Sequence, residues 1–172
     1  MTVTDVNVVK SAIFERPDDA NKGTLGSLLC VCGSYGMAGA AVMSGKGALR
    51  TGIGLAKCAL PRSIYPIVAQ TILESVYYPL SENADGRISK VNVPFLVSES
   101  CKSSATLVGC GLGVCDDTLK IVFSLIENST TPLVLDADAL NCVAKQPEIL
   151  LRKKAPIIIC LLYTSDAADE AR

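Results

Sequence analysis

Residues 27–40 read Ser27-Leu-Leu-Cys-Val-Cys-Gly-Ser-Tyr-Gly-Met-Ala-Gly-Ala40. The apolar run 27–32 has the length of a fully buried strand. It enters a glycine-rich turn and then residues 37–50, which lack proline and are rich in alanine, as in a helix. Small residues on such a helix allow close approach to a sheet or a ligand. The stretch therefore predicts a strand that runs into a helix through a tight turn.

The same alternation continues along the chain. Apolar runs predict strands at 54–60, 75–79, 105–109, 132–136 and 156–159, and helical patterns lie at 62–72, at 93–98 and from Asp116, where Asp116-Asp117 is predicted to cap the helix. Strands that alternate with helices form right-handed crossover units. The expected fold is α/β, a mostly parallel sheet with flanking helices. The leading residues, with Pro17-Asp18-Asp19, are expected to lie outside the core.

Composition limits the class of protein. The chain has 172 residues, 49% of them hydrophobic and 19% charged, which is enough apolar surface for a packed core. A net charge of -1 gives no general attraction to nucleic acid or to an anionic membrane. No stretch has the length and apolarity of a membrane span, and the first residues lack a secretory signal. We expect a cytoplasmic protein with no nucleic-acid or membrane partner.

The eight cysteines do not form a metal-binding pattern, because no Cys-x-x-Cys pair and no histidine is present. Most lie in apolar segments, and Cys30 and Cys32 would share one strand face. We interpret the cysteines in these segments as small buried hydrophobes in a reducing compartment, not as a metal or redox site. They are Cys30, Cys32, Cys58, Cys110 and Cys142.

Three turns follow predicted strands, and ligands of parallel sheets bind beyond the carboxyl ends of strands. Gly33–Ala40 and Gly109-Cys110-Gly111-Leu112-Gly113 would present backbone N–H groups to an anion. Asp136-Ala137-Asp138 could bind a metal or a ribose, or cap a helix, and each turn could also be purely structural. The phosphate-loop pattern fails at Gly45-Lys46-Gly47, and the dinucleotide fingerprint fails because Gly113 comes one residue early.

Taken in order, the motifs form a more specific pattern than any one turn. They are Lys22-Gly-Thr-Leu-Gly-Ser27 with the run to Ser34, Met37-Ala-Gly-Ala-Ala41, Ala48-Leu-Arg-Thr-Gly-Ile-Gly54, Val108-Gly-Cys-Gly-Leu-Gly113 and Leu135-Asp-Ala-Asp-Ala-Leu-Asn141. This series resembles the ADP-dependent NAD(P)H-hydrate dehydratases, a nucleotide-repair family with a three-layer ribokinase-like fold. The resemblance covers residues 21–159.

The resemblance implies a hydro-lyase that uses ADP, or ATP, with Mg²⁺ to dehydrate the S epimer of hydrated NADH or NADPH. The hydroxyl on the damaged ring would be phosphorylated and then eliminated as phosphate. Ala40 and Gly111 would contact the hydrate, and other residues would line the cleft. These are Gly33, Ser34, Gly39, Gly109, Gly113, Asp136, Asp138 and Asn141. The partners would be small-molecule nucleotides, with a homo-oligomer and an epimerase on a separate chain left open.

Two positions depart from the family pattern: Asn21 replaces a histidine and Cys110 replaces a frequent proline. The family's catalytic aspartate and nucleotide-binding region follow the segment that resembles residues 21–159, so neither a catalytic residue nor a metal ligand is assigned here. Residues 160–170, Cys-Leu-Leu-Tyr-Thr-Ser-Asp-Ala-Ala-Asp-Glu, match the translation of a transposon-type sequencing adapter. We therefore expect 1–159 to be the N-terminal part of a dehydratase domain, 160–172 to be non-native, and the fragment alone to be inactive.

Two other functions stay open on the sequence. One is a ribokinase-like kinase for a thiazole or pyrimidine alcohol, which would share the nucleotide cleft. The other is a non-catalytic nucleotide-binding α/β module.

Overall fold

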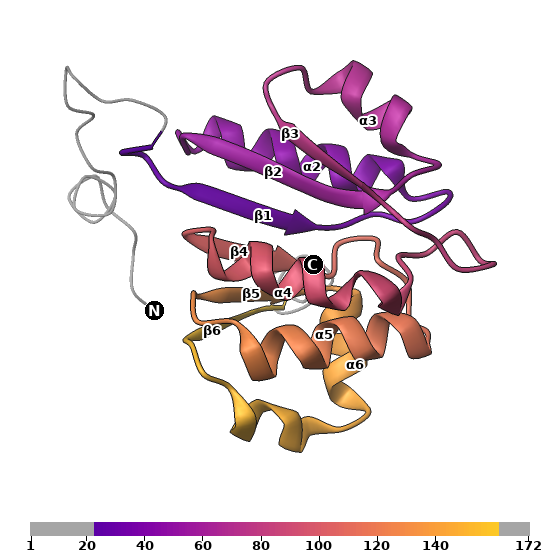
Figure 1. The fold of residues 1–172 in the computed structure, drawn as a ribbon, viewed down its shortest axis with the longest axis vertical. Coiled ribbons are helices and arrows are strands. Elements are labelled where there is room, and N and C mark those ends of the chain that lie inside the picture. Colours follow the sequence, from indigo (N-terminus) through magenta and orange to yellow (C-terminus); the bar gives the residue numbers. More distant parts are fainter. Residues whose placement is uncertain (1–22, 162–172) are drawn as a thin grey trace, which may run out of the picture.

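Six parallel strands form one sheet through residues 23–161, the part of the chain that the computed structural model describes (Figure 1). The leading segment and the tail discussed above lie mostly outside these residues. In chain order the elements are β1 (Ser27–Val31), α2 (Ala38–Arg50), β2 (Leu55–Pro61), α3 (Tyr65–Thr71), β3 (Val76–Leu80), η1 (Lys90–Asn92), α4 (Val93–Cys101), β4 (Ala105–Val108), α5 (Asp116–Asn128), β5 (Leu133–Asp136), α6 (Asp138–Ala144), η2 (Pro147–Arg152) and β6 (Ile157–Cys160).

The strand order is β3-β2-β1-β4-β5-β6, and every neighbouring pair is parallel. The first strand, β1, therefore lies in the interior of the sheet, and the chain then winds out to β3 and returns to the other side of β1. The reversal leaves a switch point between β1 and β4, where crossovers leave in opposite directions and ligands of such sheets bind. The predicted α/β class with a parallel sheet is confirmed.

Two separate cores account for the three layers. Leu29 and Val31 of β1 belong to a large apolar cluster with α4 and α5, whereas Cys30 and Cys32 belong to a second cluster with α2 and α3. Successive residues of a strand point to opposite faces, so a strand that is apolar at every position is covered on both. Figure 1 shows α2 behind the sheet and α4 and α5 in front of it.

Helix α2 packs closely on the sheet because its inner face carries small residues. Its buried positions are Ala41, Gly45 and Ala48. A Cβ atom on Gly45 would lie 2.8 Å from Cδ1 of Ile72 and 3.3 Å from the sulfur of Cys58. The predicted use of small residues for close approach is confirmed here.

Several predicted element ends are wrong by a few residues. Cys115 is the N-cap of α5, and its N–H donates to Oγ1 of Thr118 at 2.9 Å; the aspartates at 116 and 117 occupy the first turn. Helix α3 begins only at Tyr65, and strand β2 includes Pro61, one residue beyond its predicted end. No helix within residues 23–161 has the length and apolarity that crossing a membrane requires.

Candidate functional site

Two of the three predicted turns are bonded to each other at the switch point. The N–H of Gly33 donates to the carbonyl oxygen of Cys110 at 2.8 Å. The hydroxyl of Ser34, itself buried, donates to the carbonyl oxygen of Gly111 at 2.8 Å. A buried hydroxyl needs such a partner, so this bond holds the turn after β1 against the turn after β4.

The two residues that the family resemblance places on the hydrate lie against each other. Gly111 has a φ of +65°, and a Cβ atom there would lie 2.6 Å from the Cβ of Ala40 and 3.1 Å from that of Met37. Gly111 is buried and Ala40 is half-buried at the start of α2. Only a glycine permits this approach, because it has both the left-handed backbone and no side chain.

The third turn is joined to the second. The N–H of Gly113 donates to Oδ2 of Asp138 at 2.8 Å, and Nδ2 of Asn141 lies 3.3 Å from Oδ1 of the same carboxylate. Both oxygens of Asp138 are thus engaged within the protein, which favours its structural interpretation. The thiol of Cys110 donates to Oδ2 of Asp136 at 3.2 Å, so this half-buried carboxylate also faces the glycine turn.

The remaining cleft positions differ in their surroundings. Gly109, with a φ of +126°, is packed so closely that a Cβ atom would overlap the carbonyl oxygen of Asp136 and lie 2.7 Å from the nitrogen of Ala139. Gly39 and Asn141 are exposed, and a Cβ atom on Gly39 would meet nothing within 4 Å. Residues 33, 109, 111 and 113 therefore form a packed floor, with Gly39 and Asn141 at its rim.

Magnesium has no complete ligand set in this part of the protein. Within residues 23–161, no three or more acidic, histidine or cysteine side chains gather as metal ligands. Asp138 is occupied by its hydrogen bonds and Asp136 accepts one from a thiol. These carboxylates do not make a Mg²⁺ site by themselves.

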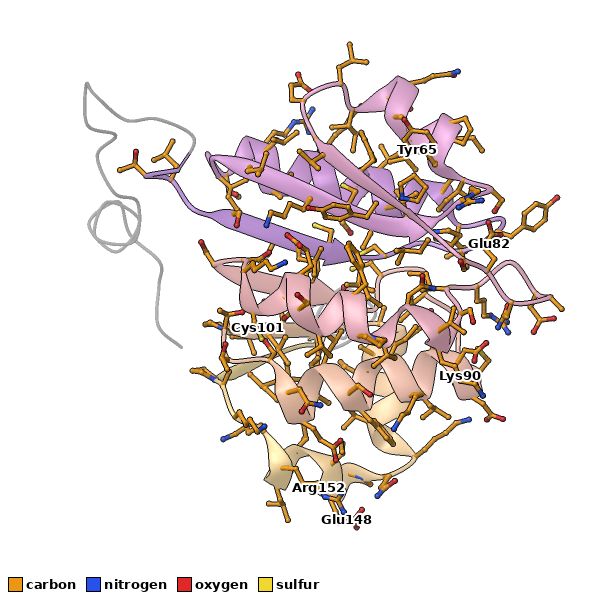
Figure 2. The ribbon with its side chains drawn as sticks, in the orientation of Figure 1. Tyr65, Glu82, Lys90, Cys101, Glu148 and Arg152 are labelled. Carbon is orange, nitrogen blue, oxygen red and sulfur yellow. The ribbon has the colours of Figure 1, made fainter. Side chains whose placement is uncertain are left out.

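A hairpin at residues 81–89 lies at the same carboxyl edge of the sheet, and the sequence patterns did not predict it. The N–H of Tyr35 donates to the carbonyl oxygen of Gly86 at 2.9 Å. The Arg87 side chain lies over Gly113, since a Cβ atom there would come within 3.0 Å of its Cδ. Glu82, labelled in Figure 2, accepts bonds from the N–H and hydroxyl of Ser63. The turn-forming string Asn-Ala-Asp-Gly at 83–86 was the available signal.

Ala137 carries backbone strain between the two aspartates. Its φ is +47°, and it is the one non-glycine residue with a positive φ in the described part of the chain. Alanine in this region is unfavourable, and strained residues often occur at binding sites. The strain sits in the turn that leads from β5 to α6, at the carboxyl edge of the sheet.

The interpretation of the five cysteines as buried hydrophobes is correct for four of them. Cys30, Cys32, Cys58 and Cys142 are at most 2% exposed. Cys110 is only half-buried, because it lies in the turn beyond β4 and not within the strand. Cys110 is therefore the one of these five cysteines that solvent reaches in part.

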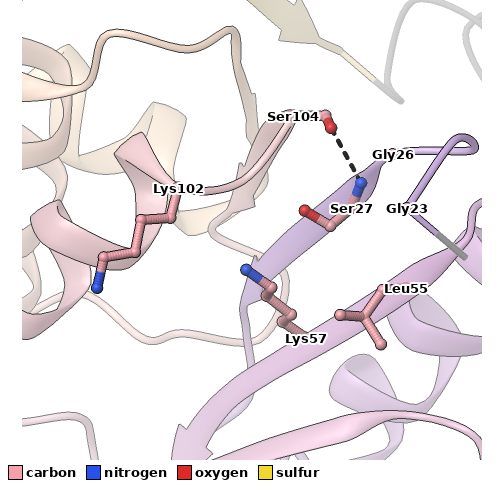
Figure 3. Close-up of a pocket in the computed structure, with 7 residues that line it drawn as sticks. All are labelled: Gly23, Gly26, Ser27, Leu55, Lys57, Lys102 and Ser104. Carbon is pink, nitrogen blue, oxygen red and sulfur yellow. Dashed lines mark hydrogen bonds between the residues drawn. The ribbon is translucent and has the colours of Figure 1, made fainter.

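A pocket of about 360 Å³ lies at the opposite edge of the sheet, where β1 and β2 begin (Figure 3). Lys57 lines it, but its ammonium is 2.7 Å from Oε1 of Glu99, with both side chains about 90% buried. The N–H of Ser27 donates to Oγ of Ser104 at 3.0 Å. The charge of Lys57 is already paired, and the amino ends of strands are not the usual ligand edge. We therefore place the candidate site at the switch point.

Comparison with known proteins gives the same assignment as the motifs. The NAD(P)H-hydrate dehydratase family model matches residues 28–160. A bifunctional NAD(P)H-hydrate repair enzyme of Thermofilum pendens is 33% identical over 84% of this chain and 28% of its own length. An ADP-dependent (S)-NAD(P)H-hydrate dehydratase of Neisseria meningitidis is 29% identical over 91% of this chain and 48% of its own.

Solved structures agree with the fold. An ADP/ATP-dependent NAD(P)H-hydrate dehydratase of Bacillus subtilis, crystallised with ATP and Mg²⁺, matches 89% of this chain and 50% of its own, with a TM-score of 0.67 and 25% identity. A ribokinase-like protein of Enterococcus faecalis matches 78% of this chain and 45% of its own, with a TM-score of 0.66 and 18% identity.

The chain spans less than half the length of these two curated relatives. The ordered motifs, the parallel sheet with its joined turns and the match over residues 28–160 agree with one another. This chain belongs to the NAD(P)H-hydrate dehydratase family.

Proposed function

We propose that the protein carrying this segment at the full length of its relatives dehydrates the S epimer of hydrated NADH or NADPH, with ADP or ATP as phosphoryl donor and Mg²⁺ as its counterion. Within it, residues 33–41 and 109–113 form the wall against which the hydrate lies. The observation that carries this assignment is the contact of Ala40 with Gly111, formed by two turns at the switch point.

The chemistry suits a site of this kind. Transfer of phosphate from ADP to the ring hydroxyl leaves AMP, and elimination of the phosphate then restores the reduced nicotinamide. Phosphoryl transfer depends on positioning and charge stabilisation more than on covalent help from the protein. A floor of closely packed glycines contributes positioning, because it lets a ligand approach the backbone. We assign Asp136 to support of the bound ligand and Asp138 to holding the turn that begins at Gly113.

The rim and the floor would have different roles. Gly39 has open space around it and would accept the bulk of the hydrate beside Ala40. The buried hydroxyl of Ser34 would not touch the ligand, since it is bonded to the Gly111 carbonyl at 2.8 Å. We propose that Ser34 acts by holding the wall together.

The test uses the full-length protein with hydrated NADPH and ADP, followed by the absorbance of reduced nicotinamide. Ala40→Leu should raise the Michaelis constant for the hydrate, because it adds bulk where ligand and backbone meet; about 1–3 kcal/mol is typical of overpacking. Gly47→Ala, on the exposed side of α2 with nothing within 4 Å, is the matched control and should leave the constant unchanged.

Two results would contradict the proposal. Phosphorylation of a thiazole or pyrimidine alcohol without dehydration of the hydrate would make the protein a kinase. Unchanged kinetic constants in Ala40→Leu would show that the hydrate does not bind against this wall, although the proposed dehydratase activity would remain valid.

A further inference from the structure

We propose that Cys110 and Cys32 form an oxidisable dithiol, in which Cys110 reacts first with a low-molecular-weight disulfide and Cys32 then closes an internal disulfide. The proposal concerns a modification of the glycine turn and is independent of the dehydratase activity.

The backbone brings the two cysteines to neighbouring positions. The N–H of Gly33 bonds to the carbonyl of Cys110 at 2.8 Å, and the N–H of Gly109 bonds to the carbonyl of Val31 at 3.2 Å. Cys32 lies between these bonds on a chain segment next to that of Cys110. Adjacent strands are about 4.8 Å apart, within the range of about 4.4–6.8 Å that a disulfide spans between Cα atoms.

The side chains also share one face of the sheet. Cys32 is a member of the smaller core cluster, and Cys110 packs against that cluster. Each thiol is the largest cause of the other's shifted pKa, as expected of neighbouring sulfur atoms. The flanking backbone bonds and the shared cluster thus place both side chains in one region of the core.

Exposure and acidity assign the order of the two steps. Cys110 is half-buried, whereas Cys32 is 1% exposed, so only Cys110 can meet a reagent from solvent. The pKa of the Cys110 thiol is lowered, chiefly by Cys32, although burial and the neighbouring Asp136 carboxylate oppose the shift. The neighbouring Cys110 and burial raise the pKa of Cys32 well above its ordinary value. The thiolate is the nucleophile in exchange, which favours Cys110 as the first to react.

The reaction balances without a further reagent. The Cys110 thiolate attacks one sulfur of oxidised glutathione, forms a mixed disulfide and releases one glutathione thiolate. The Cys32 thiol gives up its proton and attacks the Cys110 sulfur, releasing the second glutathione. Two protein thiols are oxidised and one glutathione disulfide is reduced to two thiols.

The bond would alter the candidate site. The Cys110 sulfur is 3.2 Å from Oδ2 of Asp136 in the reduced protein. A bond to Cys32 removes the thiol hydrogen that Asp136 accepts and ties the turn to the end of β1. Oxidation of the two thiols would therefore change the contacts of the turn at Cys110, which forms part of the wall of the candidate site.

Other thiols could compete, and each can be separated. Cys30 and Cys58 face each other across β1 and β2 but are at most 2% exposed. Cys160 pairs in register with Asp136 and is exposed. Cys101, labelled in Figure 2, precedes β4 and so lies at the opposite edge of the sheet.

The test treats the folded 172-residue chain with oxidised glutathione, traps free thiols and maps tryptic peptides by tandem mass spectrometry. Residues 23–46 and 103–120 each carry two cysteines, so fragmentation must separate Cys30 from Cys32 and Cys110 from Cys115. We expect a Cys32–Cys110 cross-link. Cys32→Ala should abolish it and leave glutathione on Cys110, whereas Cys58→Ala and Cys160→Ala should keep it.

Three outcomes would overturn the proposal: a stable glutathione adduct on Cys110 in the unaltered chain, a cross-link of Cys110 to Cys160 or Cys30, or no reaction at Cys110. If Cys32→Ala does not fold, the fragmentation of the unaltered chain decides alone. Unmodified Cys30 and Cys58 in that sample report that the protein stayed folded during the reaction.

Discussion

Replacing Gly109 with alanine should destabilise the protein more than any other single methyl group added to these turns. The φ of +126° lies outside the range that alanine adopts easily. The added Cβ would overlap the Asp136 carbonyl oxygen and lie 2.7 Å from the nitrogen of Ala139. Both neighbours are backbone atoms, one at the end of β5 and one in the first turn of α6, so neither can move aside as a side chain would.

The expected size follows from two separate costs. A positive φ costs an alanine about 1–2 kcal/mol. Forcing a methyl group into a packed site adds about 1–3 kcal/mol. The loss in unfolding free energy for Gly109→Ala should therefore be about 2–5 kcal/mol, a large part of the stability of a domain of this size.

Substitutions at two other glycines of the same region distinguish the cost of a positive φ from the cost of steric overlap. Gly36 has a φ of +82° but nothing within 4 Å of a new Cβ, so Gly36→Ala should lose only about 1–2 kcal/mol. Gly39 lies in α2 with the same open space, and Gly39→Ala should gain about 0.5 kcal/mol from the stiffer unfolded chain.

Urea unfolding followed by circular dichroism measures all three variants under one condition. The expected order of stability is Gly39→Ala, the unaltered chain, Gly36→Ala and then Gly109→Ala. A Gly109→Ala variant as stable as Gly36→Ala would refute the reasoning, because it would mean that the turns after β4 and β5 are not packed together.

Three further perturbations test other parts of the structure. The hydrogen bond from Lys57 is the chief cause that lowers the pKa of Glu99, so the ion pair stabilises the protein above the unfolded pKa, near 4.5, and this stabilisation is lost as the pH falls through the folded pKa. Glu99→Gln should therefore make the free energy of unfolding fall less steeply with decreasing pH. An unchanged pH dependence would show that the Lys57–Glu99 pair does not cause the acid destabilisation. Ala137→Gly should relieve the backbone strain at a φ of +47° and stabilise the protein by about 1 kcal/mol in thermal unfolding. An unchanged or lower stability would show that the turn is not strained. Ser34→Ala removes the buried bond to the Gly111 carbonyl and should cost about 1–3 kcal/mol in the same measurement. Ser44→Ala removes a half-buried hydroxyl that donates to the carbonyl oxygen of Ala40 in its own helix, and should cost less.

The order of strands and helices was predictable because it depends on local patterns. Each strand is a mostly apolar run, and the central strand β1 is buried on both faces, as at Leu29 and Cys30. Errors fell at element ends, where capping decides the boundary. At α5 the side chain of Thr118 satisfies the N–H of Cys115, and nothing in the two aspartates that follow reveals this.

The turns that meet at the candidate site were visible in the sequence, but the contacts between them were not. Glycines at 109, 111 and 113 are visible in the sequence as a tight turn, and the motif order identifies the family. That Gly111 touches Ala40 depends on the position of β4 beside β1, since the two residues are far apart in the chain. The Arg87 side chain over Gly113 likewise comes from a hairpin that no family motif included.

The sequence by itself determined the alternation of elements, the parallel class of the sheet and the glycine positions at strand ends. All three follow from the hydrophobicity and backbone freedom of residues close together in the chain. Only the tertiary structure decided that β1 lies between β2 and β4, that Ser34 closes on Gly111, and that Cys110 faces both Asp136 and Cys32. These contacts join segments distant in sequence, and they form because β1, β4 and β5 are adjacent parallel strands whose carboxyl ends lie at one edge of the sheet.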